Sequence, residues 1–252
     1  METTAVLERS AAARVVAAGR RRERLFYTCM AVAVVLTVFT GFARTYFLRP
    51  YYDARPLPSI LHLHGLVFTS WVALFLVQTS LVAAKRTDVH RRLGFAGAAL
   101  ASLMVLVGTL TAVVRAKAMD VPPGLPSPVS FLAVPLGDLL VFALLVGGGF
   151  YFRRWTAAHK RLMLLSMIAI LPAAVARIPL GFIEQGGALA YYGLSDLFIA
   201  PCLLQDILTR GRPQRATVLG GLLIVATQPL RFVVGNTHAW IAFATWLTQW
   251  TN

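Results

Sequence analysis

Seven long apolar runs occupy most of this 252-residue chain, and they constrain its fold more than any other feature. The runs cover residues 25–43, 60–84, 93–114, 130–152, 162–182, 190–208 and 216–235. A helix needs about 20 apolar residues to cross the hydrocarbon core of a bilayer, so each run is a candidate span. Only 13% of the residues are charged, whereas about 25% is usual in soluble domains. We therefore predict an all-α, polytopic membrane helix bundle with about seven transmembrane helices.

Two segments flank these runs, one at each end of the chain. Residues 1–24 are rich in arginine, and we expect them to form a cytoplasmic segment ahead of a single transmembrane bundle over residues 25–252. The last apolar run, residues 238–250, is too short to span, because a helix of that length extends only about 20 Å. Its three tryptophans are typical of a membrane interface, so we expect a short interfacial helix there.

The basic residues are distributed unevenly between the connections. If the N-terminus is cytoplasmic, 17 of the 24 Lys and Arg residues fall in the N-terminal segment and the three inner connections. Cytoplasmic loops of membrane proteins carry such an excess. We therefore expect a multi-pass protein of a bacterial inner (plasma) membrane, with its N-terminus in the cytoplasm and its C-terminus outside. This distribution accounts for the net charge of +14 with a lipid bilayer as partner and without nucleic acid.

One short phrase occurs twice, 69 positions apart, each time between two apolar runs. It reads Thr-x-x-His-basic-Arg-Leu over residues 87–93 and again over residues 156–162. Two equivalent turns predict two helical hairpins, residues 60–114 and 130–182, related as parallel repeats about an axis along the membrane normal. We expect each Thr to cap the following helix, so that each His lies in a first turn where backbone N–H groups are unpaired.

His90 and His159 are the histidines of the repeated phrase, and we expect them to lie at the same inner depth and to face each other. Two opposed imidazoles suit the iron of haem b. The basic residues beside them are placed to neutralise the haem propionates: Arg91, Arg92, Lys160 and Arg161. A quinone or another small molecule held by the histidines is a second interpretation. A third is that the phrase serves only helix capping and the basic inner loops.

The spacing after the second copy predicts a polar stripe. Arg177 follows His159 by 18 residues, or five helical turns, so we expect both residues on one face of a continuous helix.

Ionisable residues also gather in the outer half of the predicted bundle. The candidate pocket residues are His62, Asp138, Arg177, Asp196 and Arg231. An Arg or Asp at a helix centre costs about 2.5–3.5 kcal/mol on insertion scales, so we predict that these residues form a ligand pocket. We expect Asp138 to pair with Arg177, and Asp196 with Arg231. The alternative is that such pairs only lock the helices together.

No metal centre is predicted. His62 and His64 point about 200° apart around a helix and cannot chelate one ion. His62 shares its helix face with small and polar residues, so we expect this histidine to face the bundle. The two cysteines lack Cys-x-x-Cys spacing. The sequence also has no motif of soluble hydrolase chemistry, such as a nucleophile elbow.

The two turns resemble a pattern of uncharacterised bacterial multi-pass membrane proteins, in which a His-Arg-x-Leu-Gly turn precedes a His-Arg-x-Met turn. The matching positions here are His-Arg-Arg-Leu-Gly at 90–94 and His-Lys-Arg-Leu-Met at 159–163, with His62 before them and Arg177 after them. The resemblance covers roughly residues 60–180 and implies no particular activity.

The chain is also weakly similar to the ascorbate-linked b-type cytochromes, in which four core helices hold two haems between histidines on alternate helices. The similarity implies that His90 and His159 hold one haem. It does not imply a second, because the run at 130–152 contains no histidine.

Three functions therefore remain open at the level of sequence. The first is a redox membrane protein with one b-type haem or a quinone between the two histidines. The second is a small-molecule or ion transporter, or a membrane ligand sensor, that uses the outer pocket. The third is an accessory membrane subunit. No particular enzyme activity is predicted.

Overall fold

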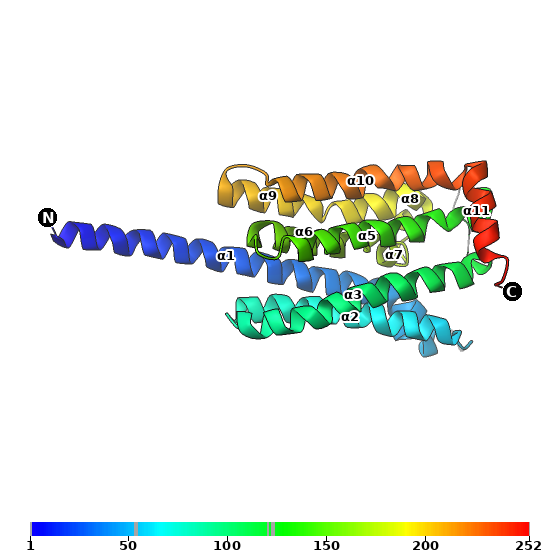
Figure 1. The fold of residues 1–252 in the computed structure, drawn as a ribbon, viewed down its shortest axis with the longest axis horizontal. Helices are drawn as coiled ribbons and strands as arrows, with labels where there is room; N and C mark the ends of the chain where they lie inside the picture. The colour runs from blue at the N-terminus through cyan, green and yellow to red at the C-terminus, as the bar shows by residue number, and fades with distance from the viewer. Residues whose placement is uncertain (1, 53–54, 120, 122–123, 252) are drawn as a thin grey trace.

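The structure is a computed structural model that describes residues 2–52, 55–119, 121 and 124–251. This part of the chain folds into helices and turns and contains no strand. Seven helical segments in it are long and apolar enough to cross a membrane: Arg21–Phe47, Ser59–Ala83, Thr87–Ala118, Pro128–Tyr151, Thr156–Val175, Gly181–Arg210 and Arg215–Gly235. They lie side by side with their axes roughly aligned (Figure 1). The predicted all-α bundle with seven candidate spans is confirmed.

The first helix, α1 (Glu2–Phe42), is longer than the first apolar run. The basic N-terminal segment therefore continues into the first span without a break, and the start of α1 projects beyond the bundle (Figure 1). At its other end α1 passes into a π-helical turn, η1 (Ala43–Phe47), and a 3-10 turn, η2 (Arg49–Tyr51).

Two helical hairpins follow. In the first, α2 (Ser59–Ala83) packs against α3 (Thr87–Arg115), which ends in the short turn η3 (Ala116–Ala118). In the second, α4 (Pro128–Phe131) leads into α5 (Ala133–Tyr151), which packs against α6 (Thr156–Ala169). Both copies of the repeated phrase therefore open the second helix of a hairpin.

The predicted threonine caps are wrong. Thr87 and Thr156 are the first helical residues, and the residues at the cap positions, Arg86 and Trp155, make no side-chain cap hydrogen bond. The backbone N–H of His90 donates to the carbonyl of Arg86 (3.1 Å), and that of His159 donates to the carbonyl of Trp155 (3.0 Å). Each histidine thus lies one full turn inside its helix, with its own N–H already bonded.

The single helix predicted over residues 162–182 is also wrong. α6 ends at Ala169, and a separate turn of helix, α7 (Pro172–Val175), begins with a proline at its first position. Proline has no N–H to continue the hydrogen-bond ladder of the preceding helix, which accounts for the break. Arg177 lies beyond α7 in the connection to α8, so it shares no continuous helix face with His159.

The rest of the chain completes the bundle. α8 (Gly181–Asp196) is kinked at Gly187, whose φ of 51° is in the left-handed region that favours glycine, and α9 (Ile199–Arg210) follows it. α10 (Arg215–Gly235) returns beside α5 and α6. The short helix expected in the C-terminal run is present as α11 (His238–Thr248), which lies across one end of the bundle (Figure 1).

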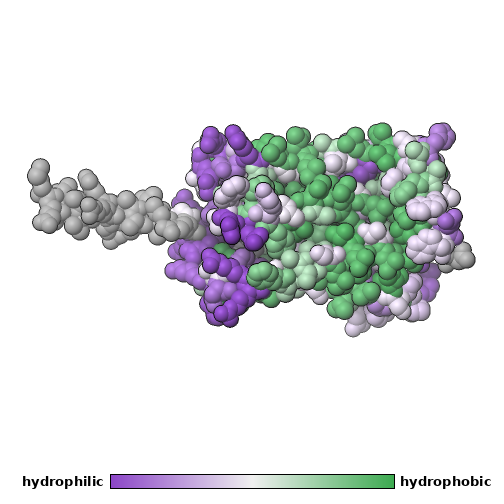
Figure 2. Space-filling view, viewed as in Figure 1, coloured by the Kyte–Doolittle hydropathy of each residue, from purple (hydrophilic) through white to green (hydrophobic). Residues whose placement is uncertain are grey.

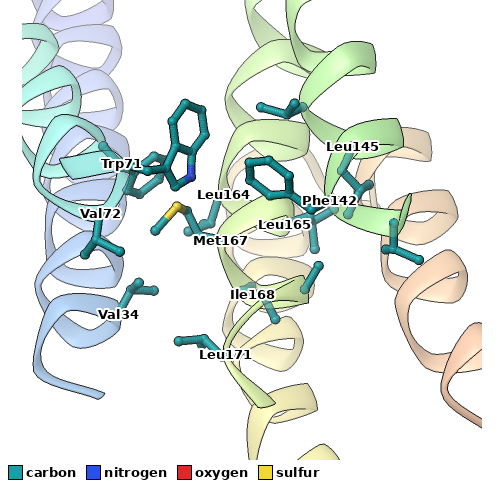
Figure 3. Packing of buried hydrophobic residues seen from close by; sticks show 14 of the residues in the cluster. Val34, Trp71, Val72, Phe142, Leu145, Leu164, Leu165, Met167, Ile168 and Leu171 are labelled. Carbon is teal, nitrogen blue, oxygen red and sulfur yellow. The ribbon is translucent and has the colours of Figure 1, made fainter. Parts of the chain in front are cut away.

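The core lies where α1, α2, α5 and α6 meet. Val34, Trp71, Phe142 and Met167 are among its fully or almost fully buried side chains (Figure 3). The Trp71 and Phe142 rings pack edge to face, with centroids 5.4 Å apart. The core is thus filled by large side chains from helices far apart in the sequence.

Apolar side chains also cover much of the outside. Figure 2 shows an apolar band between two more polar ends. One of these ends, which we call the basic end, holds the connections 84–86, 152–155 and 211–214 and the helical turns beside them (Figures 1 and 2). The outward-facing apolar band is what a bundle in contact with lipid requires.

Candidate functional site

The two histidines of the repeated phrase meet at the basic end. The ring centroids of His90 and His159 lie 6.2 Å apart, and their planes are inclined at 78°. His90 comes from α3 and His159 from α6, and α5 contacts both of these helices. The fold therefore brings together two imidazoles from different hairpins, as the sequence predicts.

The His159 ring is held in place by the neighbouring helix. Its Nδ1 lies 2.8 Å from the carbonyl oxygen of Gly149 on α5. A carbonyl only accepts hydrogen bonds, so Nδ1 carries the proton and donates; in the neutral imidazole, Nε2 then keeps a free lone pair. Such a partner on one ring nitrogen is how ligand histidines are usually oriented.

His90 has polar neighbours that are not fully satisfied. Its Nδ1 is buried and has no hydrogen-bond partner among the described residues. The Gln78 amide nitrogen donates to the His90 carbonyl (3.3 Å), while the Gln78 side-chain oxygen is also buried and unpartnered. A buried polar group without a partner costs about 1–3 kcal/mol, and two such groups, the His90 ring nitrogen and the Gln78 oxygen, belong to residues in contact here.

Glycines leave room on the His90 side of the pair. Gly94 follows His90 by one helical turn, and a Cβ atom at this position would meet nothing within 4 Å. At Gly97, a further turn along α3, a Cβ would lie 3.4 Å from a methyl carbon of Leu74. The surface of α3 is therefore uncovered at Gly94 and covered by Leu74 at Gly97.

Two of the four basic residues expected to meet haem propionates are engaged elsewhere. Lys160 forms an ion pair with Glu23 of α1, and its ammonium lies 5.6 Å from the centroid of the Tyr27 ring. Arg161 is buried in an ion pair with Asp206. Arg91 and Arg92 are exposed and form no ion pair among the described residues.

Asp206 is a site residue that sequence reasoning missed. Besides the Arg161 guanidinium, it accepts hydrogen bonds from the Thr217 hydroxyl (2.5 Å) and the Gln214 backbone N–H (3.1 Å). These contacts tie α6, α9 and α10 together at the basic end. The signal was present, because Asp206 is one of only ten acidic residues and lies within an apolar run.

The pairings expected in the outer half are wrong. Asp138 of α5 pairs with Arg231 of α10 at 2.5 Å, not with Arg177. Arg231 also donates to the Tyr192 hydroxyl (3.3 Å). Asp196 accepts a hydrogen bond from the Gln228 amide (2.8 Å) and forms no ion pair with Arg231. The reason is helix adjacency: α10 lies against α5, whereas Arg177 has left the helix altogether.

The expectation that His62 faces the bundle is also wrong. His62 is exposed beside Tyr46, with ring centroids 6.0 Å apart, while the His64 ring turns inward and stacks on Phe68 at 4.0 Å. The aromatic face of α2 fills the core, with Trp71 only 2% exposed. The inward face of this helix therefore carries its large aromatic side chains, not its small residues.

The five predicted pocket residues therefore do not form one pocket. Asp138 and Arg231 pair inside the bundle, Asp196 is bonded by Gln228, His62 is on the surface, and Arg177 lines a separate cavity. The described residues contain no group of three or more His, Cys, Asp and Glu side chains that could hold a metal ion.

Comparisons with known proteins add no family to this geometry. No protein-family model, no curated protein and no solved structure matches the chain.

Proposed function

We propose that this chain is an integral membrane redox protein in which His90 and His159 would hold one b-type haem between them. The observation that supports the proposal most is the 6.2 Å separation of the two ring centroids. Two imidazoles this close could each offer one ring nitrogen to a single metal ion held between them.

The surrounding residues support the same assignment. The carbonyl of Gly149 orients His159 so that Nε2 is available as a ligand. Arg91 and Arg92 are exposed one and two positions after His90 and would neutralise carboxylates of a bound group. Gly94 contributes open space beside His90. When bound, haem supplies one-electron transfer.

The proposed orientation places this site near the cytoplasm of a bacterium. The basic end carries most of the chain's Lys and Arg residues, and such an excess marks the cytoplasmic side of inner-membrane proteins. Fusions at the C-terminus test this orientation. We expect alkaline phosphatase to be active there and green fluorescent protein to be dark, and the reverse result overturns it.

The haem proposal is tested on the full-length protein purified in detergent from haem-replete cells. We expect b-type bands in the reduced-minus-oxidised spectrum, and their loss in His90→Ala and in His159→Ala. His238→Ala is the matched control, because His238 is exposed at the start of α11 and should leave the bands unchanged. Absence of the bands from the wild-type protein would refute the proposal. A quinone recovered from the same preparation by solvent extraction would then identify the histidine pair as a quinone site.

Transport or ligand sensing through the predicted outer pocket receives less support. Asp138 and Arg231 neutralise each other, and Arg177 and His62 lie elsewhere. An accessory subunit is distinguished by its composition: it would copurify with a stoichiometric partner and contain no haem.

A further inference from the structure

A second feature lies at the opposite end of the bundle from the histidine pair. Here the end of α1, the turns η1 and η2, and the connection between α7 and α8 line an open, surface-facing cavity of about 330 Å³. Its polar lining residues are Arg44, Thr45, Arg49, Tyr52, Arg177 and Glu184. Three arginines and one carboxylate line it, although this end of the bundle holds few of the chain's Lys and Arg residues.

The walls of this arginine cavity are fixed by a close backbone contact. Gly41 of α1 lies directly against the backbone of Ala174 in α7, so that any side chain at Gly41 would collide with it. Just after this contact α1 passes into the π-helical turn η1, which contains Arg44.

The guanidinium groups are held by their neighbours. Arg44 lies over the Tyr52 ring at 5.1 Å, and Arg177 lies over the Phe42 ring at 5.0 Å. Arg177 also donates one hydrogen bond to the carbonyl of Ala173 (2.5 Å). A guanidinium has five N–H donors, so both groups keep donors for a ligand.

Two of the arginines and the carboxylate keep their charges without an ion pair in the described part of the chain. Arg44, Arg177 and Glu184 form no ion pair there. Paired guanidinium groups recognise phosphate oxygens through charge-assisted, often bidentate hydrogen bonds. The volume is roughly ten times the 30 Å³ share of a water molecule, which leaves room for more than a single phosphate group.

We propose that the arginine cavity binds a phosphate-bearing anion, with Arg44 and Arg177 as its principal donors. The phosphate belongs either to the headgroup of an anionic lipid or to a soluble solute. The site is about a bundle length from the histidine pair, and its test does not depend on haem.

The test uses the delipidated full-length protein in detergent, with two probes. In the first arm, native mass spectrometry measures the retention of added phosphatidylglycerol. In the second, inorganic phosphate is added without lipid and the thermal unfolding midpoint is recorded. A lipid adduct without a phosphate-induced shift identifies a headgroup site, and a shift with inorganic phosphate identifies a site for soluble phosphate.

Four variants decide whether the arginine cavity is responsible. We expect Arg44→Gln and Arg177→Gln each to weaken the binding of whichever probe the wild-type protein binds, on the order of tenfold, since each substitution removes a charge-assisted donor. Arg177→Lys keeps the charge but loses the planar fork and should give an intermediate value. Arg115→Gln is the matched control at the same end, because Arg115 does not line the cavity.

Two results would overturn the proposal. One is no response of the wild-type protein to either probe, and the other is equal binding by Arg44→Gln and Arg115→Gln. If Arg177→Gln does not give monodisperse protein, the wild-type response and Arg44→Gln decide the question.

Discussion

Arg161 and Asp206 form an ion pair sealed inside the bundle, with only 3% and 2% of their side chains exposed. Every oxygen of this carboxylate has a donor: Arg161 occupies Oδ1, and Thr217 and Gln214 occupy Oδ2. The pair joins the helix of the second histidine to α9 and α10. It therefore holds the basic end together independently of any bound group.

Removal of one partner of this ion pair should destabilise the protein strongly. We expect Asp206→Ala to lower the free energy of unfolding by about 3–5 kcal/mol, because Arg161 is left buried without a counter-charge. Denaturant-induced unfolding in detergent measures the effect. The double variant Arg161→Leu with Asp206→Leu should recover much of the loss, since no unpaired charge remains. A single variant as stable as the wild-type protein would contradict this interpretation.

Two glycines of α5 provide a matched pair near the histidines. A Cβ at Gly149 would lie 2.7 Å from the Met163 sulfur, whereas one at Gly147 would meet nothing within 4 Å. We expect Gly149→Ala to cost about 1–3 kcal/mol through overpacking against α6. Gly147→Ala should stabilise by up to about 1 kcal/mol, because alanine is the better helix former. Thermal unfolding of the two variants side by side measures the difference, and equal midpoints would argue against this packing.

Buried Gln228 and half-buried Gln78 should respond differently to the same substitution. Gln228 donates the hydrogen bond to Asp196, so Gln228→Leu should cost about 1.5–3 kcal/mol, as expected for a bond to a charged group. Gln78→Leu removes a weak bond to a backbone carbonyl, but it also removes a buried oxygen that has no partner. We therefore expect a loss below about 1 kcal/mol. Chemical unfolding curves compare the two variants, and the reverse order would show that the Gln78 oxygen is satisfied.

The contact between α1 and α7 should tolerate no side chain. Gly41→Ala places a methyl group against the Ala174 backbone, which cannot rotate away. We expect a loss of about 3 kcal/mol and weaker retention of the phosphate probe, because the same contact positions Arg44. Gly19→Ala is the control, since nothing lies within 4 Å of a Cβ there. Normal phosphate binding by a folded Gly41→Ala protein would separate the cavity from this contact.

Helix number and approximate span limits followed from the sequence because they depend on local chemistry. A run of about 20 apolar residues crosses a bilayer whatever its neighbours are. The meeting of His90 and His159 was also predictable, since both open the second helix of a hairpin and so return to the same end. The break before Pro172 had a local signal too, because proline removes a helix hydrogen bond.

The partners of buried charges were not predictable in the same way. Asp138 pairs with Arg231 because α10 lies beside α5, and no pattern within either segment specifies that adjacency. The inward face of α2 was predicted wrongly. We expected the helix face with small residues around His62 to be buried, whereas aromatic rings such as Trp71 fill the core. Both errors concern relations between helices rather than within them.

The two helices that open with the same phrase differ in length, with 29 residues in α3 and 14 in α6. At 1.5 Å per residue, they run in parallel for only about 21 Å before α6 stops. Beyond that depth α3 continues unbroken, whereas the second hairpin restarts as the short α7 at Pro172. Any correspondence between the two hairpins is thus closest at the basic end. The opposite end carries the arginine cavity, which the segment after α7 helps to line and which α2 and α3 do not reach.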